Sequence, residues 1–207
     1  MLYYVLSIKE FEGEMKKLVL ATNNVHKVTE IKAILGDYFA EIVTMREVGL
    51  DIDIEETGTT FEENSFLKAS TVCRMTNLPA LADDSGLCVD ALHGAPGVYS
   101  ARYAGEEHDD QKNIDKLLAN LREAKDRRAY FTTVLTLCYP DGRSLCVQGR
   151  TEGEIAEKRF GIGGFGYDPV FFSYDLNKTF GEATAEEKNA VSHRARALAE
   201  LERVLAK

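Results

Sequence analysis

The chain has 207 residues, of which 44% are apolar and 29% charged, and its net charge is −9 at neutral pH. This composition is typical of a globular protein with one large domain or two small lobes. The acidic balance argues against a non-specific nucleic-acid binder, which needs a basic face. No apolar run approaches the roughly 18 residues that cross a membrane, so we expect no membrane partner.

The first fourteen residues look detachable from the rest. Met15 begins a short basic lead into an apolar run, so we expect an extension at 1–14, not native or disordered, before a single domain at 15–207. This N-terminal stretch lacks the apolar core of a secretory signal. The four cysteines form no CxxC pair, which favours small, buried, reduced thiols and a cytoplasmic protein.

The first half of the chain alternates strands and helices. Its predicted elements are a strand over 17–22, a helix over 26–35, a helix over 59–75 and a strand over 80–85. Apolar residues at helical spacing and a terminal Gly36 indicate the first helix. Thr60 and Glu63 form a capping-box pattern that begins the second.

The second half contains one long hairpin. Its predicted elements are a glycine-punctuated loop over 94–105, an amphipathic helix over 110–124, two strands within 128–157, a glycine-rich loop over 161–172 and a helical tail over 184–207. Asp141-Gly142 is a hairpin signal, Thr184 caps the tail, and Ser192 is a candidate cap for a final helix. Strands that alternate with helices around one hairpin predict an α/β fold with a mixed sheet.

Two adjacent acids, Asp83 and Asp84, end the apolar run at 78–82. A buried carboxylate without a partner is costly, so a cation or a metal should meet them. Side chains alternate along a strand, so the two acids should point to opposite faces. Magnesium takes one or two carboxylates plus substrate phosphates, and Glu55 or Glu56 could supply the second acid; spacing does not separate these two.

Cations and donors lie in other polar segments. The loop TNNVHK (22–27) precedes a helix N-terminus, which attracts anions, and Lys27 adds a full charge. It matches neither a P-loop nor a dinucleotide fingerprint. Lys68 shares a helix face with Asn64, four residues before it.

Two segments near the C-terminus suit a flat heterocycle. In FGYD, Phe165 or Tyr167 could stack on a ring and Asp168 could accept from ring N–H groups. In KNAVSHR, His193 and Arg194 are donors for a phosphate or a base carbonyl. Together with the acids and the cations, these are the parts of a nucleoside triphosphate site.

The sequence resembles the inosine triphosphate pyrophosphatase (Ham1-like) family, most closely its bacterial branch. The matching segments, in the family order, are LVLATNNVHKVTEIKAIL, EETGTTFEENSFLKA, ADDSGLCVDALHGAPGVYSARYAG, GGFGYDPVFF and EEKNAVSHRARAL. The resemblance implies an elongated mixed β-sheet flanked by helices, in two lobes with a central active-site cleft. It also implies a Mg²⁺-dependent homodimer that converts ITP, dITP and XTP into the monophosphate and pyrophosphate, cleansing the nucleotide pool.

The same resemblance implies roles for individual residues. Asp84 is the general base and, with Glu55, a Mg²⁺ ligand. The substrate-binding residues that it implies are Thr22, Asn23, Asn24, Val25, His26, Lys27, Lys68, Ser85, Phe165, Gly166, Tyr167, Asp168, Lys188, His193 and Arg194. Donors that face a 6-oxo group would meet another donor in ATP, which gives a reason for purine selectivity.

Three other interpretations stay open from the sequence. A Maf-like nucleotide pyrophosphatase would share the metal chemistry and prefer another base. A nucleotide-binding module would hold the triphosphate without cleaving it. A generic α/β domain would use its acids structurally and bind no nucleotide with Mg²⁺.

Overall fold

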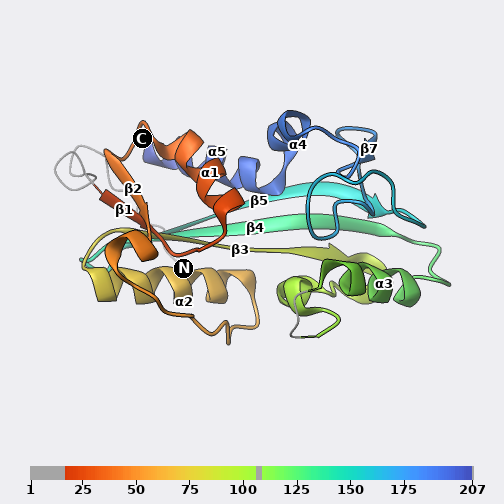
Figure 1. The fold of residues 1–207 in the computed structure, drawn as a ribbon, viewed down its shortest axis with the longest axis horizontal. Helices are drawn as coiled ribbons and strands as arrows, with labels where there is room; N and C mark the ends of the chain where they lie inside the picture. The colour runs from red at the N-terminus through yellow and green to blue at the C-terminus, as the bar shows by residue number, and fades with distance from the viewer. Residues whose placement is uncertain (1–16, 106–108, 207) are drawn as a thin grey trace. The chain divides into compact units, whose positions relative to one another are not determined.

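The protein is described by a computed structural model that covers residues 17–105 and 109–206, so the extension predicted at 1–14 lies outside the described residues (Figure 1). Seven strands form one sheet in the order β2-β1-β3-β4-β5-β6-β7. The strands are β1 (Lys17–Leu20), β2 (Glu41–Thr44), β3 (Ala80–Val89), β4 (Arg128–Cys138), β5 (Ser144–Ile155), β6 (Phe171–Ser173) and β7 (Lys178–Thr179). β1 pairs in parallel with β2 and β3, whereas β6 is antiparallel to β5 and β7. The predicted mixed α/β fold is confirmed.

Five α-helices and three short 3₁₀ turns complete the described part of the chain. The helices are α1 (Val25–Leu35), α2 (Phe61–Thr76), α3 (Asp110–Asn120), α4 (Ala185–Val191) and α5 (His193–Leu205). The turns are Arg46–Val48, Asp90–Leu92 and Gly97–Arg102. Capping boxes at Thr60 and Thr184 begin α2 and α4, as their sequences predict, and the Ser192 hydroxyl accepts from the Ala195 N–H at the start of α5.

The chain packs into two compact units, each built from several stretches. The first contains the chain up to Asp84 together with Val134–Val147 and Ala197–Lys207, and the second contains Ser85–Thr133 and Gln148–Arg196. Neither unit is one continuous piece of sequence. The boundary on β3 falls between Asp84 and Ser85.

The first unit has an apolar layer on each face of its strands. Leu18 and Leu20 of β1 pack with helices α1 and α5 in one buried cluster. Val19, between them, packs with α2 in another buried cluster. Figure 1 shows α1 and α5 on one side of these strands and α2 on the other. The alternation of side chains along a strand explains this three-layer arrangement.

The second unit has its own core. Residues of β3, α3 and β4 pack with the aromatic rings of Phe131, Phe171 and Phe180. The centroids of Phe131 and Phe171 lie 4.7 Å apart and those of Phe171 and Phe180 lie 5.1 Å apart, both in tilted pairs. These geometries are favourable for aromatic rings and hold β4, β6 and the residue that follows β7 together.

The expectation of buried thiols is correct for three cysteines and wrong for one. Cys73, Cys88 and Cys138 are buried, whereas Cys146 is exposed. Position 146 belongs to the exposed set of β5, along which exposed and buried residues alternate from Cys146 onward. In the described part of the chain, no helix has the length and apolar character needed to span a membrane.

Candidate active site

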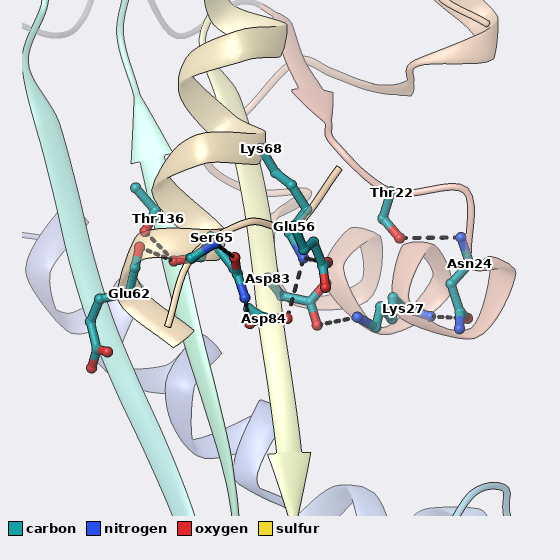
Figure 2. A network of polar contacts seen from close by, with 12 residues as sticks. Thr22, Asn24, Lys27, Glu56, Glu62, Ser65, Lys68, Asp83, Asp84 and Thr136 are labelled. Atoms are coloured by element: carbon teal, nitrogen blue, oxygen red, sulfur yellow. Dashed lines mark hydrogen bonds and ion pairs between the residues drawn. The ribbon is translucent and has the colours of Figure 1, made fainter. Parts of the chain in front are cut away.

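The two adjacent acids of β3 lie on opposite faces of the strand, as the alternation predicts. Asp83 follows the register of Leu81, which packs with α1 and α5. Asp84 follows the register of Ala80 and Ala82, which pack with α2. Figure 2 shows Asp83 directed at Lys27 and Asp84 directed at the side of α2. Each acid therefore serves a different group of residues.

Asp83 is held by the cation of the N-terminal loop. Its Oδ2 lies 2.8 Å from Lys27 Nζ, and its side chain is 1% exposed. The loop before α1 is stabilised by its own side chains, since the Asn24 N–H donates to Thr22 Oγ1 at 3.2 Å and Asn24 Oδ1 accepts from the Lys27 N–H at 3.3 Å. The helix start that we predicted as an anion site is thus anchored to β3 through Lys27.

Asp84 belongs to a second group with Lys68 and Glu56. Lys68 Nζ donates to Glu56 Oε1 at 2.5 Å and lies 3.4 Å from Asp84 Oδ1. Burial alone would lower the pKa of Lys68, but the negative charges of Asp84, Asp83 and Glu56 outweigh it and raise the pKa. Burial raises the pKa of Asp84, and the positive charge of Lys68 opposes this shift. A buried carboxylate with a raised pKa is suited to accept a proton.

Glu55 and Glu56, the two adjacent acids before α2, differ in burial and in contacts. Glu55 is exposed, whereas Glu56 is partly buried and contacts Lys68. The structure therefore places Glu56, and not the predicted Glu55, beside the group that contains Asp84. Exposed and partly buried residues alternate over 51–58, so neighbouring side chains point opposite ways and only one of the pair faces this group.

The carboxylates of Glu56 and Asp84 fit a magnesium ion as a two-acid donor set. Both already converge on one cation, the ammonium group of Lys68. Among the described residues, no group of three or more His, Cys, Asp or Glu side chains could hold a metal. Magnesium binds through one or two carboxylates, and water and substrate phosphates complete its shell. This donor set thus suits a metal that arrives with a triphosphate.

In the second unit, Asp168 is the centre of a polar group of its own. Its Oδ2 accepts from the Phe165 N–H at 2.8 Å and pairs with Lys188 Nζ. Lys188 Nζ also lies 4.4 Å from the centroid of the Phe165 ring. Burial raises the pKa of Asp168, and the charges of Lys188 and Arg194 oppose that shift. Asp168 thus fixes the loop and the lysine, a role that its residue type alone did not predict.

The aromatic residues of this loop differ in exposure. Phe165 is 42% exposed, whereas Tyr167 is buried and donates its hydroxyl to the Ser100 carbonyl at 2.8 Å. The Gly166 N–H between them donates to Asp110 Oδ2 at 2.8 Å. Of the two rings that we predicted could stack on a base, only Phe165 has a face open to solvent.

The remaining predicted residues of the second unit are mostly enclosed. His193 and Arg194 are buried, and the His193 ring stacks on Phe131 with centroids 4.8 Å apart. The Ser85 hydroxyl shares a 2.8 Å hydrogen bond with Thr133 Oγ1. Lys188 pairs with Asp168, and the charge of Arg194 also acts to lower the pKa of Asp168, against the rise that burial causes. Aromatic stacking thus fixes the plane of the His193 ring.

The structure thus separates the predicted residues into two groups. In the first unit, Lys27 pairs with Asp83, whereas Lys68 and Asp84 lie in a group with Glu56 (Figure 2). Asn23, Asn24 and Val25 are exposed on the loop before α1 and Thr22 is half-buried, and the side chain of His26 lies outside the described part. Sequence reasoning missed the contacts of Asn64, whose place four residues before Lys68 was the available signal.

Three comparisons bear on the identity of the chain. The Ham1 family model matches residues 18–204. A dITP/XTP pyrophosphatase of Clostridium perfringens is 50% identical over 195 residues, which cover 90% of this chain and 96% of that protein. One of Bacillus subtilis is 48% identical over 193 residues, which cover 92% and 98%.

Solved structures agree with these sequence matches. The Ham1 protein of Staphylococcus aureus is 43% identical with a TM-score of 0.87, and the match covers 92% of this chain and 98% of that one. A Ham1 protein of Coxiella burnetii, also 43% identical, has a TM-score of 0.88 and coverage of 93% and 99%. The fold, the carboxylate and lysine network and these matches lead to one conclusion: the chain belongs to the Ham1 family.

Proposed function

We propose that this protein hydrolyses the triphosphates of non-canonical purines, namely ITP, dITP and XTP, to the nucleoside monophosphate and pyrophosphate. The observation that carries the proposal is the buried carboxylate of Asp84, which shares the ammonium group of Lys68 with the acid Glu56. The relatives at about half identity are named dITP/XTP pyrophosphatases, which supports the same substrate class.

Asp84 acts as the general base. It accepts a proton from the water that attacks phosphorus, the bond to the leaving oxygen breaks, and pyrophosphate leaves. The raised pKa of Asp84 suits proton acceptance. Bound Mg²⁺ would screen the charge of the phosphates and of the leaving pyrophosphate. We assign Glu56 and Asp84 to hold it, because these two carboxylates share a cation in the structure.

Lys27 and Lys68 supply positive charge for the triphosphate. Both ammonium groups are paired with acids in the structure, Lys27 with Asp83 and Lys68 with Glu56 and Asp84. Thr22, Asn24 and the positive end of α1 add polar groups suited to the same phosphates. Ser85, which follows the catalytic acid directly in β3, is assigned to the same phosphates.

The residues of the second unit are assigned to the purine base. Phe165 offers an exposed ring for stacking, while Asp168 and Lys188 fix its loop. His193 and Arg194 are N–H donors suited to the 6-oxo group of hypoxanthine and xanthine. Adenine carries an amino donor at that position, and a site built from donors rejects it because the donors would be left unpaired.

We also propose that the enzyme is a cytoplasmic homodimer without a nucleic-acid or membrane partner. The net charge of −9 supports the absence of nucleic-acid binding. Sedimentation of the purified protein would test the dimer, and a mass equal to one chain would reject it.

The test of the function is pyrophosphate release from ITP, dITP, XTP, GTP, ATP and dTTP with Mg²⁺. We expect release from the first three only, and a loss of at least about 10³-fold in Asp84→Asn, because the general base is removed. Asp37→Asn, which alters an exposed acid of the same unit, is the control and should keep full activity. Preference for dTTP would favour a Maf-like enzyme, and binding of ITP without cleavage would favour a nucleotide-binding module.

A further inference from the structure

We propose that Asn64 is a positioning residue that fixes the carboxylate of Asp84 and, with the same side chain, the loop that carries Glu56. The role rests on the proposed function, since it concerns the orientation of the proposed base. It gives a task to a residue that touches neither phosphate nor base in our assignment.

The contacts of Asn64 reach two segments of the first unit. Its Nδ2 donates to Asp84 Oδ2 at 3.2 Å, and its Oδ1 accepts from the Gly58 N–H at 2.8 Å. The residue is completely buried. The side-chain amide of this α2 residue therefore contacts both Asp84 of β3 and the loop before α2.

Only an amide of this length satisfies both contacts. A carboxylate would keep the acceptor but lose the donor, and an apolar side chain of the same size would lose both. A buried group that loses its partner costs more than the bond contributes when it is made. The residue type is therefore fixed by the two contacts together.

The backbone of Gly58 packs closely against the side chain of Asn64. A Cβ at position 58 would meet Asn64 Oδ1 at 2.6 Å and the Cβ of Glu63 at 2.7 Å. The close approach of backbone to amide explains why glycine stands two residues after Glu56. Substitution at position 58 would displace the amide without changing its chemistry.

Hydrogen bonds of Glu63 and Ser65, the residues on either side of Asn64, fix the start of α2. Glu63 Oε2 accepts from the N–H of Thr59 at 2.7 Å and of Thr60 at 3.3 Å, which closes the loop onto the helix. Ser65 shares a 2.7 Å hydrogen bond with Thr136 of β4 (Figure 2). The amide of Asn64 is therefore held in place before any substrate binds, which is what a positioning group requires.

Three variants separate the two contacts. Asn64→Leu removes both, Asn64→Asp keeps the acceptor for Gly58 and removes the donor to Asp84, and Gly58→Ala displaces the amide. We measure kcat and KM for dITP with Mg²⁺ and, in the protein without substrate, hydrogen exchange of the Gly58 amide. A loss of about 10- to 100-fold is typical for such supporting contacts.

We expect kcat to fall about 10- to 100-fold in Asn64→Leu and Asn64→Asp, with KM changed less than about threefold. Exchange at Gly58 should rise in Asn64→Leu and stay slow in Asn64→Asp. Asn113→Leu is the matched control, because Asn113 is also buried, accepts from the Ala104 N–H at 2.6 Å and donates to the Ala101 carbonyl at 3.1 Å. It should lower the melting temperature without this loss of kcat.

Two results would overturn the role. If wild-type protein is active and both Asn64 variants keep its kcat, Asn64 is only structural and the proposed function stands. If wild-type protein cleaves none of the triphosphates, the proposed function fails and the role fails with it. Should Asn64→Leu not fold, Asn64→Asp and Gly58→Ala decide the question by the same ratio of kcat values.

Discussion

Lys27 and Asp83 form a 2.8 Å ion pair in which the two partners differ in burial. The side chain of Lys27 is 19% exposed, whereas that of Asp83 is 1% exposed. The lysine can reach water if its partner is removed, and the carboxylate cannot. The pair therefore fixes Lys27 at the start of α1. The loss of stability on breaking it should depend on which of the two residues is substituted.

We predict that Lys27→Met destabilises the protein more than Asp83→Asn. The first change leaves a buried charge without its lysine, which costs about 3–5 kcal/mol in comparable pairs, and the second removes the buried charge itself. Urea unfolding of both variants measures the difference. Equal losses of unfolding free energy would contradict the asymmetry.

Glu55 and Glu56 offer a second matched pair. We predict that Glu56→Gln lowers kcat/KM for dITP about 10- to 100-fold and raises the Mg²⁺ concentration needed for half-maximal rate, because Glu56 shares a cation with Asp84. Glu55→Gln should stay within about twofold of the wild type. The reverse order, with Glu55→Gln impaired, would return the metal ligand to position 55.

The glycines at 164 and 166 test the loop that holds Phe165. Both have a positive φ, +74° and +58°, so alanine costs a similar backbone strain of about 1–2 kcal/mol at each. A Cβ at Gly164 would also meet Asp168 Oδ2 at 2.0 Å, whereas one at Gly166 would meet nothing within 4 Å. We predict that Gly164→Ala raises KM for dITP about tenfold and Gly166→Ala much less.

Because alanine causes a similar backbone strain at both positions, the difference between the two variants reports the displacement of Asp168. If they raise KM equally, then displacement of Asp168 has no effect on substrate binding. In that case the assignment of this loop to the base loses its main structural support.

Glu63 gives a prediction for stability against pH. Hydrogen bonds from Thr59 and Thr60 lower its pKa below the ordinary value of 4.5. A carboxyl with a lowered folded-state pKa stabilises the protein above its unfolded value, and this contribution is lost as the pH falls through the folded value. We predict that Glu63→Gln lowers the melting temperature at pH 7 and that the difference disappears as the pH drops below 4.5.

Glu62→Gln is the control, because it removes the same charge from the same helix turn. Its effect at pH 7 should be smaller. A pH-independent difference between wild type and Glu63→Gln would show that the cap acts through shape and not through charge.

The sequence predicts the site better in some places than in others. The alternation along β3 correctly places Asp83 and Asp84 on opposite faces, because a strand has a fixed period of two. The capping box of α2 is equally local. The choice between Glu55 and Glu56 depends on how an irregular segment meets Lys68, and no local pattern contains that contact.

In the fold, too, features set by neighbouring residues were predicted and features set by residues far apart in the chain were not. The hairpin at Asp141-Gly142 and the caps at Thr184 and Ser192 are set by neighbouring residues, and these predictions are confirmed. The four-residue strand β2 was not predicted, because its pairing with β1 comes from a distant part of the chain. The burial of Tyr167 depends in the same way on Ser100, 67 residues away.

The discontinuous make-up of the first unit has a consequence for synthesis on the ribosome. Its core contains Leu18 and Leu20 from the start of the described chain and Leu198, Leu201 and Leu205 from its end. A nascent chain that has emerged as far as residue 196 still lacks this final apolar layer. Leu18 and Leu20 of β1 therefore stay partly exposed until the last helix is made, and a chaperone that covers them would act during that interval.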